Sequence, residues 1–356
     1  MYILGIETSC DDTAAAVIKA EGGLSKPRFS VLSSVSYSQV AIHKKFGGIV
    51  PNLASRAHLQ KISPTVKSAL SVAKKSPVSD IEVDLIAVTR GPGLMPSLLV
   101  GVNFARALAY TWRKPIIGVN HIEGHIYSNW LSNKKIEFPA LILIVSGGHT
   151  ELVLMKKHGQ YNIIGETLDD AAGECFDKTA RILGLGFPGG PAIAREAAKF
   201  KDSDTNSKIQ LPRPIIYSKD YNFSFSGLKT AVLYLHKGIS KPAILRQAQD
   251  PELIRGMAHE IQEAIVEVLV AKTLKAVKNF KPKTVMIAGG VAANKKLREC
   301  LAEKIAPYNI ITSLPELSYT TDNAAMIAAA GYINYLKNKS KKDSWKKVEA
   351  NANLRL

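Results

Sequence analysis

The stretch YILGIETSCDDTAAAVI, residues 2–18, contains two apolar segments joined by a short polar one. Residues 2–6 form a continuous apolar run, residues 7–12 are mostly small or polar, and residues 13–18 are apolar again. Apolar runs of this length, bounded by turn residues, are typical of buried strands. The sequence therefore predicts a β-hairpin over residues 2–18.

A second stretch, LILIVSGGHTELVLM at residues 141–155, repeats the same order of strand, turn and returning strand. A strand, a glycine turn and a helix also occur twice, around Gly91-Pro92-Gly93 and around Gly289-Gly290. Such turns present backbone N–H groups to anions. Chance could produce similar pairs in any α/β protein. The ordered recurrence nevertheless predicts an internal duplication, with both hairpin turns facing one ligand in a central cleft.

The predicted fold class is therefore α/β, with two duplicated lobes, a central cleft and a helical insertion in the second lobe. The first lobe would span residues 1–130 and be completed by a helix at about 324–340. The second lobe would span 131–323, with the insertion at about 165–220. A helix over 250–280 is assigned to the core, and residues 341–356 to a solvated basic tail.

Composition limits the possible functions. The 356 residues are 46% hydrophobic, enough for a sizeable core, and no apolar stretch is long enough to span a membrane. Lysine and arginine number 47 against 30 acidic residues, a net charge of +17. This excess favours a nucleic-acid partner, although it could also serve solubility. The three cysteines are far apart and no basic leader precedes Glu7, which indicates a cytoplasmic location.

The segment His121-Ile-Glu-Gly-His125 indicates a metal site. Histidines at positions i and i+4 share one helix face, so both rings can reach one ion. Glu123 lies about 200° round the helix from His121 and should point away from the metal, unlike the glutamate of zinc proteases. Asp322 could be the third ligand or merely the N-cap of the following helix. Two imidazoles and a carboxylate suit iron, zinc or manganese.

Seven segments in order resemble the tRNA adenosine threonylcarbamoyltransferase family, within the fold superfamily of actin, Hsp70 and sugar kinases. The family resemblance covers about residues 3–330, and the segment Gly-Glu-Cys-Phe-Asp-Lys at 173–178 is similar to the bacterial branch. It implies ribonuclease-H-like lobes. The matching segments are residues 5–11, 121–125, 145–150, 173–178, 187–191, 289–294 and 321–323.

The resemblance implies transfer of a threonylcarbamoyl group from threonylcarbamoyl-AMP to N6 of adenosine 37 in tRNAs that read codons beginning with A, with release of AMP. It implies a metal, Fe²⁺ or Zn²⁺, on His121, His125 and Asp322. Asp11 is a candidate for proton handling at the amine, or else a carboxylate that orders the turn. The implied substrate-binding residues are Ile144, Val145, Ser146, Gly147, Gly148, Asp177, Gly190 and Asn294. The implied partners are tRNA, a paralogous subunit similar to the first lobe, and a small ATPase; no membrane partner is expected.

Two positions and one longer stretch depart from the family pattern. Ala194 stands where some members have an acidic residue, Asp12 stands where bacterial members have glutamate, and residues 241–255 look unusual. Alternative functions are an ATP-dependent kinase or ATPase of the same superfamily, a non-catalytic scaffold, and a metalloprotease. Kinases of this fold hold Mg²⁺ with carboxylates and water, so the histidine pair argues against the first.

Overall fold

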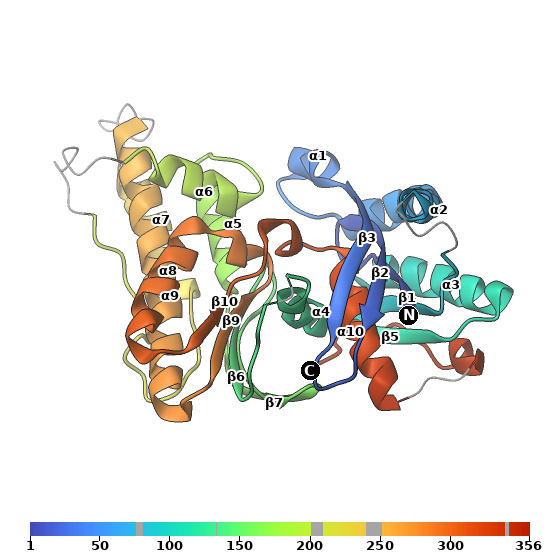
Figure 1. Cartoon of the computed structure of the whole chain (residues 1–356). Helices are drawn as coiled ribbons and strands as arrows, with labels where there is room; N and C mark the ends of the chain where they lie inside the picture. Colours follow the sequence, from blue (N-terminus) through green and yellow to red (C-terminus); the bar gives the residue numbers. More distant parts are fainter. Residues whose placement is uncertain (76–80, 133, 201–208, 240–250, 339–341) are drawn as a thin grey trace. The chain divides into compact units, whose positions relative to one another are not determined.

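The computed structural model describes residues 1–75, 81–132, 134–200, 209–239, 251–338 and 342–356. The chain divides into two compact units (Figure 1). The first unit comprises Met1–Ile136, Lys157–Tyr161 and Pro315–Leu356, and the second comprises Glu137–Lys156 and Asn162–Leu314. Three predicted features lie wholly or partly outside the described residues: the polar part of the insertion at 201–208, the helix start at Asp250, and the unusual stretch at 241–250.

The first unit is built on a mixed sheet with the strand order β3-β2-β1-β4-β5. β1 pairs antiparallel with β2, which confirms the predicted hairpin, and β1, β4 and β5 run parallel. β2 is longer than predicted because it pairs with β3 along its whole length, beyond the residues that pair with β1. The strands are β1 Tyr2–Glu7, β2 Asp12–Glu21, β3 Arg28–Ser38, β4 Leu85–Gly91 and β5 Ile116–Asn120.

The second unit repeats this topology. Its strand order is β10-β9-β6-β7-β8, in which β6 pairs antiparallel with β7 and parallel with β9, and β9 parallel with β10. β6 therefore corresponds to β1, and the β6–β7 hairpin to the β1–β2 hairpin. The predicted duplication is confirmed. The strands are β6 Ala140–Val145, β7 Thr150–Lys157, β8 Gln160–Glu166, β9 Thr284–Ala288 and β10 Ile311–Ser313.

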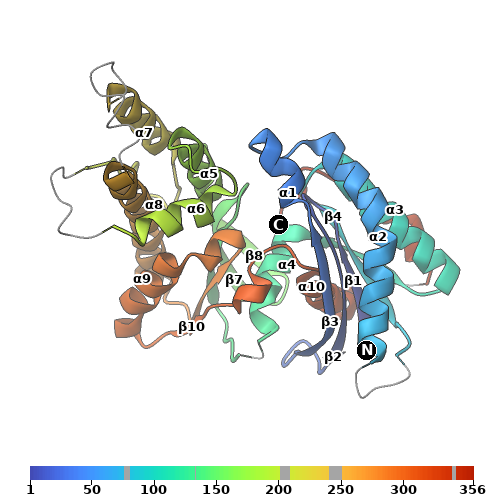
Figure 2. The same cartoon turned by 90° about the horizontal axis from the view of Figure 1, so that it is seen from above.

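Helices cover both faces of the first sheet (Figure 2). α2 and α3 pack through apolar residues such as Val66 and Val102 against one face, and α10 lies on the other. α10 can approach because Gly5 has no side chain: a Cβ there would lie 2.1 Å from the carbonyl oxygen of Ala324. The helices of this unit are α1 Val40–His43, α2 Pro51–Lys74, α3 Met95–Trp112, α4 His121–Tyr127 and α10 Ala324–Asn338.

The helices of the second unit form one large apolar core with β6, β7 and β9. Within the predicted insertion the first helix begins at Ala172, because residues before it are held elsewhere: the carboxylate of Asp169 accepts a hydrogen bond from the Phe225 N–H at 2.7 Å. These helices are α5 Ala172–Ile182, α6 Gly189–Ala197, α7 Ser226–Ile239, α8 Pro251–Phe280 and α9 Lys295–Ile305. None of the helices in the described ranges is long and apolar enough to cross a membrane.

Short 3₁₀ turns connect several of these elements. They are η1 Lys44–Phe46, η2 Ser128–Trp130, η4 Gly290–Ala293, η5 Ala306–Tyr308, η6 Leu317–Tyr319 and η7 Lys342–Lys346.

The C-terminal segment is not the solvated tail that its lysines predict. Trp345 and Ala350 pack on the apolar core of the first unit, and Val348 is 7% exposed within it. The backbone is tied down as well, because the Asn351 N–H donates to the Arg90 carbonyl at 2.7 Å. Three apolar anchors spaced among the lysines are enough to hold this segment against α3 and β5. The prediction is wrong for residues 342–356.

Candidate functional site

The carboxyl ends of β1, β4 and β5 meet at one edge of the first sheet, and the short helix α4 begins directly after β5. Asn120 caps α4, accepting hydrogen bonds from the N–H groups of Ile122 at 2.8 Å and Glu123 at 3.3 Å. This cap fixes where the helix starts, and with it the face on which His121 and His125 lie.

The structure brings His121, His125 and Asp322 together. Asp322 Oδ1 lies 3.4 Å from His121 Nε2 and 3.2 Å from His125 Nε2, and the two Nε2 atoms are 3.2 Å apart. The alternative role of Asp322 as the N-cap of α10 is wrong. Asn323 caps that helix, accepting from the Met326 N–H at 2.9 Å, so the Asp322 carboxylate is available to the histidines.

These separations fit a bound metal ion. Metal–ligand bonds of about 2.1 Å place neighbouring ligand atoms about 3.0 Å apart in an octahedron and about 3.4 Å apart in a tetrahedron. The three observed separations are 3.2–3.4 Å, and all three atoms converge on one point. Two imidazoles and one carboxylate form the donor set that iron(II) and catalytic zinc sites use.

Glu7 orients the first histidine. It is completely buried at the end of β1, and its Oε2 lies 3.0 Å from His121 Nδ1, while its carboxylate also accepts from the Ser9 N–H and the Thr89 hydroxyl at 2.5 Å each. A proton on Nδ1 that is held by Glu7 makes Nε2 the ring nitrogen that can bind a metal when it loses its own proton. Sequence reasoning assigned Glu7 no role. A carboxylate that ends a fully apolar strand was the available signal.

Interactions among the charged side chains of this cluster strongly shift their pKa values. Burial alone would lower the pKa of His121, but the carboxylates of Asp322 and Glu7 hold that pKa well above its usual value. Burial would raise the pKa of Asp322, but the two histidines lower it. The pKa of His125 is lowered, chiefly by burial. The cluster therefore concentrates negative charge that a proton or a cation can neutralise.

Glu123 faces away from the histidines, as its position on the helix predicts. Its two oxygens accept hydrogen bonds from Tyr161 Oη at 2.7 Å and Asn334 Nδ2 at 2.6 Å. A glutamate held in this way cannot act as a base at the histidine pair. The arrangement argues against proteolysis by the zinc-protease mechanism.

Two further carboxylates lie in or beside the β1–β2 turn. Burial and the charge of Asp322 raise the pKa of Asp11. Burial, followed by the charges of Asp322 and Asp11, raises the pKa of Asp12 to about 7, and Asp12 Oδ1 is buried with no hydrogen-bond partner among the described residues. The turn is held from behind by the buried His58, whose ring contacts the Cys10 carbonyl at 3.1 Å.

The β6–β7 turn of the second unit, unlike the β1–β2 turn, contains no carboxylate. Ile144 and Val145 end β6 and are fully buried, so only their backbone groups reach the turn. Ser146 shapes the turn through its N–H, which donates to the His149 carbonyl at 2.8 Å. The N–H groups of Gly147 and Gly148 have no hydrogen-bond partner within the described residues, and a Cβ at either position would meet no atom within 4 Å.

The other predicted substrate-binding residues surround the same edge of the second sheet. A Cβ on Gly289 would lie 2.4 Å from the Val145 carbonyl oxygen, so the end of β9 adjoins the turn. Asp177 Oδ1 accepts from the Gly189 N–H at 2.6 Å and so fixes the start of α6, where Gly190 lies open. Asn294 caps α9 through the Leu297 N–H at 3.0 Å. Asp177 and Asn294 therefore have structural partners already.

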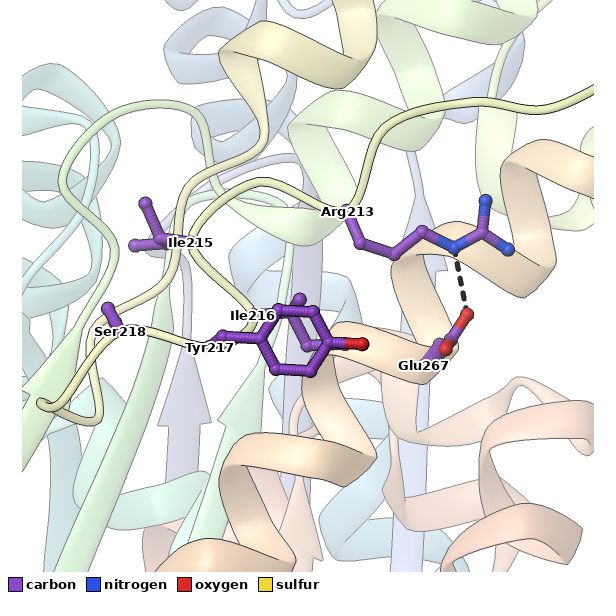
Figure 3. Close-up of a pocket in the computed structure, with 6 residues that line it drawn as sticks. All are labelled: Arg213, Ile215, Ile216, Tyr217, Ser218 and Glu267. Atoms are coloured by element: carbon purple, nitrogen blue, oxygen red, sulfur yellow. Dashed lines mark hydrogen bonds and ion pairs between the residues drawn. The ribbon is translucent and has the colours of Figure 1, made fainter.

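A cavity of about 450 Å³ in the second unit contains none of these predicted residues (Figure 3). Arg213 and Tyr217 line it, and Figure 3 shows the Arg213 Nε donating to Glu267, at 2.8 Å. Arg213 also pairs with Glu260. Its charge is therefore neutralised within the protein.

Comparison with known proteins gives a consistent result. Residues 30–329 match the family model for tRNA N6-adenosine threonylcarbamoyltransferase. A protein of that name from Thermosipho africanus is 46% identical over 356 residues, covering 100% of both chains. Another, from Bacillus subtilis, is 48% identical over 339 residues, covering 95% of this chain and 91% of its own.

A solved structure shares the fold at low sequence identity. T. kodakarensis HypF has a TM-score of 0.57 at 12% identity, over 97% of this chain and 49% of its own. With the two sheets of identical strand order, this likeness confirms the predicted fold class of two duplicated actin-like α/β lobes.

Proposed function

The chain belongs to the tRNA N6-adenosine threonylcarbamoyltransferase family, and from that membership we propose its complete reaction. The protein transfers a threonylcarbamoyl group from threonylcarbamoyl-AMP to N6 of adenosine 37, in tRNAs that read codons beginning with A, and AMP leaves. The observation that carries the proposal is the convergence of His121, His125 and Asp322 on one point, with separations of 3.2–3.4 Å.

His121, His125 and Asp322 would hold one divalent metal ion, for which iron(II) is our first choice and zinc our second. Such a metal would supply Lewis-acid stabilisation of negative charge on the donor. Glu7 keeps His121 in the tautomer whose Nε2 can act as a ligand, through the 3.0 Å contact to Nδ1. The donor is already activated as a mixed anhydride, so the protein has only to position the reactants and stabilise charge.

The β6–β7 turn would bind the phosphate of the donor. The N–H groups of Gly147 and Gly148 lack partners among the described residues, and the space around both Cα atoms is open. Backbone N–H groups in a turn of this kind form hydrogen bonds with phosphate oxygens. Gly190, at the start of α6, and Asp177 and Asn294 would complete the nucleotide site, the latter two by fixing neighbouring backbone.

Asp11 is our candidate for accepting the proton that the adenine amine loses. Burial and the negative charge of Asp322 raise its pKa, which makes the carboxylate a stronger base than an exposed aspartate. We assign AMP as the leaving group because its phosphate departs as a weak base and needs no proton.

The alternatives are less well supported. A kinase or ATPase would share the fold but has no use for a pair of imidazoles. A metalloprotease would need Glu123 at the histidine pair, whereas Glu123 binds Tyr161 and Asn334. A paralogous subunit similar to the first unit, a small ATPase and a cytoplasmic location remain part of the proposal.

The test is reconstitution from purified components. We expect the protein, loaded with iron(II) or zinc and supplied with threonylcarbamoyl-AMP and tRNA transcript, to form threonylcarbamoyladenosine that is detected by mass spectrometry of digested tRNA. The partner subunits are added in a second arm. His125→Ala should lose metal and product together, because one of three ligands is gone.

Glu123→Gln is the matched control, since Glu123 lies on the same helix between the two histidines and glutamine keeps the shape of its side chain and one acceptor oxygen. It should retain metal. Metal loss in this variant would contradict the assignment of Glu123 to the other side of α4. Full product formation by His125→Ala protein without metal would eliminate the metal from the proposal and support a role for the turn alone.

A further inference from the structure

A second cavity, of about 610 Å³, lies where α8 ends and β9 and β10 begin. Lys278, Lys281, Lys283, Tyr308 and Asn309 are among the residues that line it. This 278–283 groove is at the amino ends of β9 and β10, whereas the turn at Gly289-Gly290 follows the carboxyl end of β9. The groove is therefore at the opposite edge of the second sheet from the proposed phosphate-binding turn.

The groove carries unpaired positive charge. All three lysines are exposed, and none makes an ion pair or side-chain hydrogen bond with any residue in the described ranges. Glu137 is the single carboxylate among the lining residues. The C-terminal carbonyls of α8 add only about −0.5 charge. The net charge is therefore about +1.5, whereas Arg213 in the other cavity is neutralised by Glu260 and Glu267.

Lys281 also occupies a backbone position that usually belongs to glycine. Its φ is 45°, in the left-handed region, and its N–H donates to the Val277 carbonyl at 2.9 Å to close the end of α8. A residue with a side chain costs about 1 kcal/mol here relative to glycine. No hydrogen bond or ion pair of the lysine side chain within the described structure offsets that cost. The ammonium group of Lys281 is therefore available to a ligand.

Two other lining residues suit a nucleic acid. Tyr308 is 39% exposed and presents an aromatic ring, and Asn309 presents an amide. Ammonium groups bind phosphate oxygens, while tyrosine and asparagine contact sugars and bases. From these features we propose that the 278–283 groove binds the phosphate backbone of the tRNA substrate, away from the adenosine that is modified. This inference rests on the proposed function, which supplies the RNA.

Lys281→Gly tests the groove without weakening the fold. Glycine relieves the left-handed φ, so the unfolding temperature should stay equal or rise, while one phosphate contact is lost. Each lost contact should lower tRNA affinity about sixfold at 0.1 M salt and reduce the salt slope by about 0.7–0.9. The double variant Lys281→Gly/Lys283→Ser should therefore bind tRNA about 30-fold more weakly.

Lys219→Ser is the matched control, because Lys219 is an exposed lysine of the same unit without an ion pair in the described structure. It should bind tRNA as wild type does. In transfer assays the groove variants should show a raised KM for tRNA with kcat, metal content and donor affinity unchanged. Unchanged tRNA affinity in the double variant, or an equal loss in Lys219→Ser, would overturn the groove assignment.

Two further outcomes distinguish a failure of the groove assignment from a failure of the proposed function. If wild-type protein transfers no threonylcarbamoyl group but the double variant loses tRNA affinity, the reaction is wrong and the RNA site stands. Tripolyphosphate should weaken tRNA binding only by raising the ionic strength. Saturable displacement by micromolar tripolyphosphate that Lys281→Gly abolishes would assign the groove to a small phosphate compound, and the RNA proposal would fail.

Discussion

The turn after β1 and the turn after β6 occupy equivalent places in two sheets of the same strand order. Each joins its strands through four residues, 8–11 in the first unit and 146–149 in the second. The first follows the buried carboxylate of Glu7 and contains Asp11. The second follows the apolar Val145 and contains two adjacent glycines with open space around them.

This difference shows how two copies of one hairpin can suit ligands of opposite charge, a cation in the first unit and an anion in the second. In the first unit, carboxylates at the strand end and in the turn concentrate negative charge beside the histidines of α4, which suits a cation. In the second unit, Gly147 and Gly148 carry no side chain, and their backbone N–H groups have no hydrogen-bond partner among the described residues, which suits an anion. Three predictions test whether this division of chemistry is real.

The largest effect is expected from a side chain at Gly148. Gly148→Val should reduce affinity for threonylcarbamoyl-AMP about 100-fold, because two hydrogen bonds to a charged phosphate contribute about 1.5 kcal/mol or more each. The fold should survive, since a Cβ at this position meets no atom within 4 Å and φ is not left-handed. Calorimetric titration with the donor measures the effect.

Gly23→Val is its control, because Gly23 is equally open but lies in the first unit. It should bind the donor normally, and tRNA affinity should change little in either variant. Equal donor affinity in wild type and Gly148→Val would place the phosphate elsewhere and remove the contrast between the two turns.

The next effect concerns the acidic turn. Glu7→Gln should lower metal affinity about 10- to 100-fold, the usual range for a residue that orients a ligating histidine. Competition with a chelator of known affinity measures it. Thr89→Val removes only one donor to Glu7 and should have a smaller effect. If both variants bind metal as wild type does, His121 needs no orienting carboxylate.

The smallest effect is on stability and depends on pH. The pKa of Asp12 is raised to about 7 by burial and by two neighbouring aspartates. A raised carboxyl pKa means that the folded state holds its proton more tightly, so ionisation costs stability as pH rises from about 4 to 7. Asp12→Asn should therefore stabilise the metal-free protein at pH 8 and leave its stability nearly unchanged at pH 4.

Urea unfolding at both pH values checks this, with Glu82→Gln as an exposed control in the same unit. The gain should be absent in the control. An equal gain from Asp12→Asn at pH 4 and pH 8 would show that Asp12 titrates normally, and that the acidic turn concentrates less charge than its geometry indicates.

The hairpins and the glycine turns could be predicted because they depend on local patterns. Continuous apolar runs bounded by small residues place β1, β2, β6 and β7, and the i, i+4 spacing of His121 and His125 places both rings on one face of α4. The direction of Glu123 also follows from helix geometry alone, and the structure confirms it.

Two kinds of feature could not be determined from the sequence. One is which of two adjacent residues takes a given role, and the other is which residues far apart in the chain make contact. Asp322 and Asn323 are both good capping residues, and only the packing of α10 selects Asn323 and turns Asp322 to the histidines. Glu7 meets His121 across more than a hundred residues. The C-terminal lysines suggested a solvated tail, because three apolar anchors among many charges give no periodic pattern.

The first unit is made of segments that lie far apart in the chain, and this has a consequence for biosynthesis. Its sheet is made early, but α10, Asp322 and the anchoring C-terminal segment are translated last, after nearly all of the second unit. Domains fold as the nascent chain emerges, so the second unit can finish folding while the first still exposes the sheet face that α10 covers. We expect a released chain that ends before residue 315 to present a protease-sensitive first unit beside a protected second one. A metal held by His121, His125 and Asp322 would then be loaded only at the end of translation.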